Sequence, residues 1–385
     1  MNKKILILGL LCCLQACGLV DDYLLGKDNV PQPKALEPLK PRLTVQEKWS
    51  LVIGSSHSGH GYLKLKPSIV GDTIYVADAS GVVQAIHRQT GKVNWSQTFK
   101  TGLVSGPAVG EGTLVVGTAA SSVVVMSQSD GHVLWKQSVS GDVLSQALIV
   151  DHKVIVKTID GHLYAFDAHT GATLWVADHG APSLILKASS APVMMDHVIL
   201  VGFSDGKLDG IDLDSGRVLW QKSLVYASGS SDIERLVDID ADPIVRHGLL
   251  YLASYQGYVG ALSVSDGLFV WNRPASVYKN MAMDERTLYL TDSHDMIWAI
   301  DVQTGQVNWK QNALKARGLT EPVLMGSWLI VGDKAGYLHI LSTQNGDLLA
   351  RSQRVGAIDI SPVVTGHDVF VMTAKGRFDH LVVHS

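Results

Sequence analysis

Asp238, Asp240 and Asp242 alternate along one short segment, a spacing at which carboxylates can share a cation. Calcium prefers such oxygen ligands, but an EF-hand loop also requires a central glycine and a final bidentate glutamate. This segment lacks that glycine, and Leu249 stands where the glutamate belongs. The sequence therefore disfavours an EF-hand calcium site.

His57 and His60 are the other pair whose residue type suits a metal, in this case zinc. They lie in a run of glycine, serine and histidine, which is typical of a linker. The chain has no H-E-x-x-H motif, no nucleophile elbow and no phosphate-binding glycine loop. The linker interpretation is preferred, and the sequence indicates no catalytic residue, no cofactor and no metal site.

A binding role fits the same part of the chain better. In an extended segment over 181–187, Leu184 and Leu186 point to one side with Lys187 beside them. The segment over 231–243 is rich in acidic residues. Apolar anchors beside a charged rim suit a protein partner. The alternative is that the two leucines pack beneath the second segment.

These candidates lie within a repeat that returns seven times along the chain. In the copy over Ala147–Trp175, a glycine stands four residues before the tryptophan. The first position of each copy, most often a proline (the lead position), is 28 residues from the tryptophan position in all seven. Short strands repeating about every 40 residues are typical of a β-propeller. The tryptophan positions are Trp95, Trp135, Trp175, Trp220, Trp271, Trp309 and, as an exception, Ala350.

Each copy is expected to form a four-stranded antiparallel blade. Several strands are apolar without alternation, as expected for sheets covered on both faces. The tryptophan on strand D is expected to be an aromatic wedge between blades, and Ala350 predicts weaker packing in blade seven. In the third copy the expected strands A to D are Ala147–Val150, Val154–Thr158, His162–Asp167 and Ala172–Ala177.

The two ends of the repeat region complete the ring. Thr44–Ile53 contains Trp49 and has the pattern of an isolated strand D, whereas Pro362–His384 supplies only strands A to C. The fold class predicted is therefore all-β, an eight-bladed β-propeller of four-stranded antiparallel blades over residues 44–385. Pairing of the N-terminal strand with the C-terminal blade closes the ring and leaves no open edge between the first and last blades.

Length variation falls in one place, the connection from strand D to the next strand A. The longest two connections are neighbours: Val176–Ala191 after blade three (the first insertion) and Gln221–Asp242 after blade four (the second insertion). All D–A connections of such blades lie on one rim of the ring. We therefore expect the two insertions side by side, on a rigid scaffold where functional loops are usual.

The first 17 residues are predicted to be a targeting segment. Two lysines precede the apolar run Ile5–Leu14, which is too short to span a membrane. Leu14-Gln15-Ala16-Cys17 resembles the lipobox of bacterial lipoproteins, which implies lipidation at Cys17 as the mature N-terminus. An ordinary cleavage site is disfavoured because Leu14 is too large for an A-x-A pattern. Gly18 in place of aspartate implies export to the outer membrane.

Residues 18–43 are proline-rich and are predicted to be a flexible tether, with a reach of roughly 85 Å when fully extended. Removal of residues 1–16 would leave Cys17 as the sole cysteine, hence no disulfide. It would also leave 30 basic against 36 acidic residues, a net charge of −6. That charge argues against nucleic acid or anionic lipid as the main partner.

The repeat A-x-D-x-x-T-G-x-x-x-W, seen in Ala299–Trp309, resembles the blade of pyrroloquinoline-quinone-type propellers. Ala181–Pro192 and Asp232–Pro243 are similar to segments of the BamB family, the propeller lipoproteins of the outer-membrane β-barrel assembly machine (the BAM complex). The resemblance implies a periplasm-facing, lipid-anchored scaffold that is not an enzyme. It implies binding to the periplasmic POTRA domains of BamA, and contact with unfolded barrel proteins through exposed strand edges.

The contact residues that the resemblance implies belong to the two insertions. Lys187 stands where the family commonly has arginine, so the charge is kept without the bidentate geometry. The implied partner-binding residues are Leu184, Leu186, Lys187, Arg235, Asp238 and Asp240.

Two other classes share the blades. A quinoprotein dehydrogenase typically adds a vicinal disulfide, calcium-binding carboxylates and often a haem motif. Here the one Cys-Cys pair is Cys12-Cys13 in the targeting segment, and C-x-x-C-H is absent. A polysaccharide-binding propeller would need exposed aromatic side chains in its central funnel, which the sequence does not place.

Overall fold

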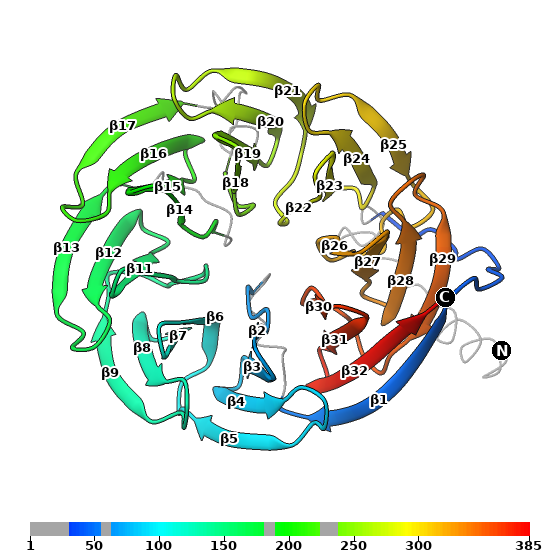
Figure 1. Ribbon diagram of the computed structural model, residues 1–385, viewed down its shortest axis with the longest axis horizontal. Coiled ribbons are helices and arrows are strands. Elements are labelled where there is room, and N and C mark those ends of the chain that lie inside the picture. Colours follow the sequence, from blue (N-terminus) through cyan, green and yellow to red (C-terminus); the bar gives the residue numbers. More distant parts are fainter. Residues whose placement is uncertain (1–30, 55–62, 181–188, 224–237) are drawn as a thin grey trace, which may run out of the picture.

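The computed structural model describes residues 31–54, 63–180, 189–223 and 238–385. These residues form 32 strands in eight four-stranded antiparallel sheets, arranged as blades around a central axis (Figure 1). No helix in this part of the chain is both long and apolar enough to cross a membrane. The predicted all-β, eight-bladed propeller is confirmed.

The first four blades follow the chain in order. Blade one has β2 (Ser68–Val70), β3 (Thr73–Ala77), β4 (Val82–His87) and β5 (Val93–Thr98). Blade two has β6 (Leu103–Gly110), β7 (Thr113–Thr118), β8 (Ser122–Ser127) and β9 (Val133–Ser138). Blade three has β10 (Leu148–Val150), β11 (Lys153–Lys157), β12 (His162–Asp167) and β13 (Thr173–Asp178). Blade four has β14 (Val193–Met195), β15 (Val198–Gly202), β16 (Lys207–Asp212) and β17 (Val218–Ser223).

The last four blades end with the closing strand. Blade five has β18 (Ile244–Arg246), β19 (Leu249–Ala253), β20 (Gly257–Ser263) and β21 (Phe269–Ala275). Blade six has β22 (Ala282–Met283), β23 (Thr287–Thr291), β24 (Ile297–Asp301) and β25 (Val307–Gln311). Blade seven has β26 (Val323–Met325), β27 (Trp328–Gly332), β28 (Tyr337–Ser342) and β29 (Leu348–Gln353). Blade eight has β30 (Val363–Thr365), β31 (Asp368–Met372), β32 (Arg377–His384) and β1 (Thr44–Val52).

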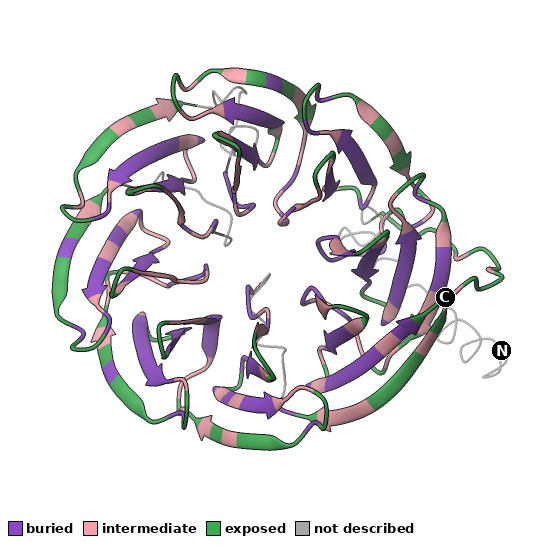
Figure 2. Cartoon of the chain, in the orientation of Figure 1, coloured by how far each residue is buried: buried purple, intermediate pink, exposed green. Residues whose placement is uncertain are grey.

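Ring closure occurs in blade eight, as predicted. β1 pairs antiparallel with β32, from Thr44 opposite His384 to Val52 opposite Arg377. The hydroxyl of Ser50 donates a 2.7 Å hydrogen bond to Oδ1 of Asp379, a fully buried carboxylate. The middle strands of each blade are buried between neighbouring blades, whereas the outermost strands are largely exposed (Figure 2).

The strand D tryptophans lock each blade to the next one. Trp135 Nε1 donates a 2.8 Å hydrogen bond to the carbonyl of Ala168 in blade three. Its ring covers Gly171, where a β-carbon would lie 2.6 Å from Trp135 Cδ2. The repeated glycine therefore provides both a left-handed turn and the room for the ring of the preceding blade. The same bond to the next blade is made by Trp49, Trp95, Trp175, Trp271 and Trp309.

Trp220 is an exception, because its ring does not cover the glycine of the next blade. Its ring lies over Gly210 on the neighbouring strand of its own blade. The corresponding partner in blade three, Ala165, carries a β-carbon that excludes this position. The side chain of Lys222 lies against Gly267 instead. The aromatic lock is thus missing where the second insertion begins.

Ala350 also lacks the lock, for a different reason. A tryptophan there would need the C–D turn of blade eight, but strands C and D of that blade are β32 and β1, which no turn connects. Ala350 is buried in a cluster that Leu43 and Val45 help to fill. That blade seven is weaker than the others remains a prediction.

The part of the predicted tether that the structure describes is held against the propeller. The amide of Lys34 donates a 3.0 Å hydrogen bond to the carbonyl of Lys315, and that of Arg42 a 2.8 Å bond to the carbonyl of Leu349. Leu36 packs against the core between blades six and seven. The flexible tether over residues 18–43 stays a prediction, and in this structure its described part, residues 31–43, contacts blades six and seven.

Candidate functional site

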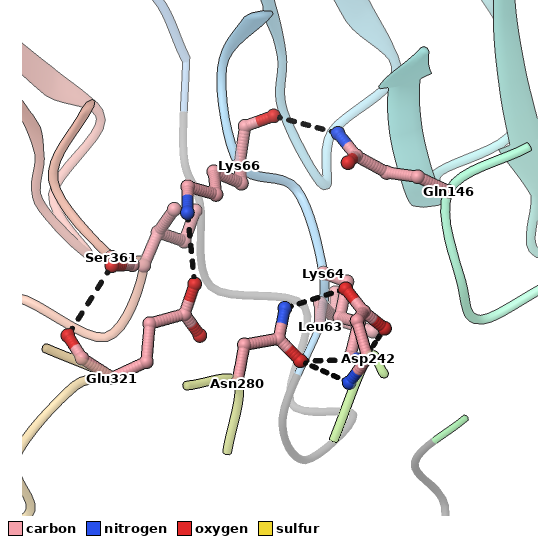
Figure 3. A pocket seen from close by; sticks show the side chains of 9 residues that line it. Leu63, Lys64, Lys66, Gln146, Asp242, Asn280, Glu321 and Ser361 are labelled. Atoms are coloured by element: carbon pink, nitrogen blue, oxygen red, sulfur yellow. Dashed lines mark hydrogen bonds and ion pairs between the residues drawn. The ribbon is translucent and has the colours of Figure 1, made fainter. Parts of the chain in front are cut away.

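The D–A connections converge on one mouth of the central channel. Six blades place there the residue that comes directly before the lead position. Together with Leu63, Lys64 and Ile360 they enclose a volume of about 20 Å³, room for a single ordered water (Figure 3). The six are Lys66, Gln146, Asp242, Asn280, Glu321 and Ser361.

Asp242 joins the ends of the two insertions. Its Oδ1 accepts hydrogen bonds from the amide of Ala191, at 2.7 Å, and from Lys64 Nζ, at 2.6 Å. Its Oδ2 accepts a 2.6 Å bond from Asn280 Nδ2, and its amide donates to Asn280 Oδ1 at 2.8 Å. Burial raises the pKa of this carboxyl, but the Lys64 charge and these hydrogen bonds outweigh it and hold the pKa below its usual value. Asp242 is therefore an anionic bridge between the first and second insertions.

Lys64 reaches this bridge from the loop that enters blade one. Its side chain is only 6 % exposed. Besides Asp242, Nζ contacts the carbonyl of Asp240 at 2.8 Å and Asn280 Oδ1 at 3.2 Å. Figure 3 shows Lys64, Asp242 and Asn280 in contact on one side of the hollow. A cation from blade one thus braces blades five and six across the channel mouth.

A second lysine lies on the other side of the insertion ends. Lys157 Nζ donates to the carbonyl of Gly202 at 2.6 Å and to Ser190 Oγ at 3.3 Å. Burial lowers its pKa to about 8, although the Asp240 charge opposes that shift. Burial likewise raises the pKa of Asp240 to about 6 against the opposing charges of Lys64 and Lys157. The ends of the insertions therefore lie in a compact cluster of buried charges of both signs.

Two of the predicted partner-binding residues belong to this cluster. The side chains of Asp238 and Asp240 are buried, and the carbonyl of Asp238 accepts a 2.9 Å hydrogen bond from the amide of Tyr255. The second insertion turns inward here, so the acidic alternation faces lysines and not solvent. Contact with a partner stays a prediction for both residues, whose side chains are buried in this conformation.

The other four predicted contact residues lie outside the described residues. They are Leu184, Leu186, Lys187 and Arg235. His57 and His60 lie outside them as well. The side-by-side placement predicted for the insertions is confirmed for their ends by the bond between Ala191 and Asp242.

The aspartate alternation does not form a cation site in this arrangement. The ammonium groups of Lys64 and Lys157 provide the positive charge that a cation would bring. Within the described ranges, no three His, Cys, Asp or Glu side chains are placed to hold a metal ion.

The sequence interpretation missed Lys64, Lys157 and Asn280. One signal was available for Asn280, because the position before each lead residue recurs at the same place in every blade. No pattern marks Lys64 or Lys157, since each is defined only by the blades that it faces.

Comparisons with known proteins agree with this architecture. The family model described as "Outer membrane protein assembly factor BamB" matches residues 79–311. The protein of that name from Legionella pneumophila (strain Paris) is 55 % identical over 383 residues, covering 100 % of both chains. The one from Escherichia coli (strain K12) is 31 % identical over 363 residues, covering 91 % of each chain.

Solved structures give the same result. The crystal structure of BamB from Moraxella catarrhalis superposes with a TM-score of 0.80 at 25 % identity, covering 88 % of this chain and 100 % of that one. A europium-containing methanol dehydrogenase reaches a TM-score of 0.72 over 88 % of this chain and 93 % of that one. At 13 % identity that likeness concerns the fold alone. The chain belongs to the BamB family of outer membrane protein assembly factors.

Proposed function

We propose that this protein is a non-enzymatic scaffold subunit of the outer-membrane β-barrel assembly complex. It binds the periplasmic POTRA domains of BamA through the rim that carries the two insertions, and it assists the folding and insertion of barrel proteins. The observation that carries the proposal is the bond between Ala191 and Asp242, which holds the ends of both insertions together. Two loops that share one anchored base can present a single binding surface.

The binding residues proposed for that surface are Leu184, Leu186, Lys187 and Arg235. Asp238 and Asp240 are proposed to act from beneath, by fixing the end of the second insertion in the lysine cluster. Apolar anchors supported by a rigid base are the usual source of binding energy at protein interfaces.

The residues at the channel mouth do not fit the quinone and calcium of a quinoprotein dehydrogenase. The Asp242 carboxylate, which could otherwise face a cation, is already bonded to Lys64 and Asn280. The mature chain also lacks a vicinal cysteine pair. These features, with the names of the relatives, favour the scaffold over the enzyme.

The proposed location is the periplasmic side of the outer membrane, with a lipid anchor on Cys17. Replacement of Cys17 by serine is expected to release the protein into the periplasm or to leave it unprocessed. Unchanged fractionation of Cys17→Ser with the outer membrane would refute the anchor.

Affinity purification of the full-length protein from detergent-solubilised membranes tests the partner. We expect BamA to co-purify in a stable, stoichiometric complex. A preparation that yields the protein without BamA, or that oxidises alcohols when quinone and calcium are added, would reject the scaffold.

A further inference from the structure

Residues 31–43, here called the N-terminal strap, cross the outside of blade seven. In Figure 1 the strap is the blue segment beside β29, ahead of the closing strand β1. Two main-chain hydrogen bonds fasten it at its ends, from the amide of Lys34 to Lys315 and from that of Arg42 to Leu349. The strap is therefore seated on the propeller through sequence-independent contacts at both of its ends.

Two arginines of the propeller donate hydrogen bonds to carbonyl groups of the strap. Arg317 Nη1 donates to the carbonyl of Lys34 at 3.1 Å, and Arg351 Nη1 donates to that of Glu37 at 3.3 Å. Arg317 is itself buried, and its Nε donates to Asp333 Oδ2 at 2.7 Å. A guanidinium already held by a buried carboxylate is fixed before the strap arrives, so little side-chain entropy is lost when it binds.

Apolar contacts complete the seat. Leu36 packs against the cluster that contains Leu314 and Leu319, between blades six and seven. Leu43 packs in the cluster around Ala350, where the repeat lacks its tryptophan. The strap thus covers the side of blade seven that the aromatic lock leaves without a partner.

The contacts also give the direction of the strap. Lys315 belongs to the D–A connection between β25 and β26, on the same rim as the two insertions. Leu349 lies at the start of β29, next to the C–D turn on the opposite rim. The strap therefore runs from the D–A rim to the C–D rim, with its N-terminal end at the D–A rim.

We propose that the strap orients the propeller, holding the D–A rim toward a lipid surface. This inference rests on the proposed lipid anchor at Cys17. Residues 18–30 span at most about 45 Å, roughly half the reach of a tether that is free up to residue 43. The mature charge of −6 gives the propeller no net electrostatic attraction of its own for anionic lipid.

Energy transfer on neutral vesicles tests the orientation. The mature lipoprotein is incorporated into phosphatidylcholine vesicles that contain an acceptor dye on the lipid headgroups. A donor dye is attached either at Lys100→Cys, an exposed site on the D–A rim of blade one, or at Thr90→Cys, an exposed site on its C–D rim. We expect higher transfer efficiency from position 100. Equal transfer, or higher transfer from position 90, would overturn the proposal.

Release of the strap provides the second measurement. The double variant Leu36→Asp, Arg351→Ala is expected to equalise the two transfer efficiencies and to speed hydrogen exchange at the amides of Lys34 and Arg42. Lys40→Asp, at an exposed strap position, is the matched control and should leave both readouts unchanged. If the double variant keeps the wild-type difference in transfer, the strap does not set the orientation.

The vesicles contain no BamA, so a failure of the proposed partner binding leaves this test unaffected. Protein that stays in solution would show that the anchor itself is wrong. Protein that is anchored without a preferred rim would reject the strap alone.

Discussion

The amide nitrogen of Ala191 lies 2.7 Å from Oδ1 of Asp242 and ties the end of one insertion to the end of the other. Fifty-one residues separate this donor and acceptor along the chain. The same carboxylate holds Lys64 and Asn280, so four parts of the ring meet on one side chain. The ends of the two insertions therefore share one hydrogen-bonded base.

Asp242→Ala is expected to destabilise the protein by on the order of 3 kcal/mol. The change leaves the buried ammonium of Lys64 without its carboxylate, which costs far more than the loss of a surface ion pair. Urea unfolding measures the difference. Asp72→Ala removes an exposed carboxylate that lies 3.3 Å from Arg88, and should cost about 1 kcal/mol or less. Equal losses in the two variants would contradict the bridge.

Adding Lys64→Met to Asp242→Ala gives a further check on the same bridge. Removal of both charges takes away the unpaired ammonium, so part of the lost stability should return. A double variant less stable than Asp242→Ala would show that Lys64 stabilises the mouth by other contacts.

The contact between each strand D tryptophan and the next blade predicts that alanine substitutions at two glycines of similar backbone conformation differ in their cost to stability. Gly171 has φ +72° and lies under Trp135, whereas Gly248 has φ +74° and no atom near its β position. Gly248→Ala should cost about 1 kcal/mol for the left-handed backbone. Gly171→Ala should cost a further 1–3 kcal/mol, roughly, because the methyl group displaces the ring.

Thermal or urea unfolding of both glycine variants tests this expectation. Trp135→Ala provides the reference, with an expected loss of about 3–5 kcal/mol. Similar stabilities for the two glycine variants would mean that the ring yields easily, and the lock would then be only a packing contact.

His179 predicts a pH dependence of stability. Its imidazole lies between Asp209, at 2.6 Å, and Asp205, at 3.2 Å. Burial lowers its pKa, but the hydrogen bonds that its N–H groups donate to the two carboxylates outweigh this and raise the pKa to about 9. Because the pKa of His179 is raised in the folded state, its charged form stabilises the fold. This contribution is fully present below the unfolded pKa near 6.5 and is lost as the pH rises through about 9.

Unfolding free energies between pH 6 and pH 9.5 check this contribution. The wild type should lose stability relative to His179→Gln across that window, because only the wild type has this imidazole. His132→Gln changes an exposed histidine beside Asp130 and serves as the control. A wild type and a His179→Gln variant with parallel pH profiles would exclude a charged His179.

Much of the fold was predictable because the repeat has a constant length. The spacing of lead position and tryptophan fixed the blade count, and the isolated Trp49 segment indicated how the ring closes. Trp220 was not predictable from its own identity, since the neighbouring Gly210 redirects its ring. Local spacing gives the blade, whereas cross-strand partners decide what each side chain touches.

The candidate site was predictable in position but not in detail. Insertion lengths placed it on one rim between blades three and five. The acidic alternation suggested surface charge, yet Asp238 and Asp240 turn inward to the lysines of other blades. Those lysines are distant in sequence, so no local pattern could reveal the pairing. The docked strap was missed for the same reason, because its seat belongs to blades six and seven.

Binding of the purified protein to the POTRA domains of BamA, measured by calorimetry, tests the central claim most directly. Leu184→Asp on the first insertion is compared with Leu268→Asp, which puts the same charge at an exposed leucine on the opposite rim. The account predicts at least about a tenfold weaker affinity for Leu184→Asp, roughly 1.4 kcal/mol, and wild-type affinity for Leu268→Asp. Wild-type affinity in Leu184→Asp, or equal losses in both folded variants, would contradict it.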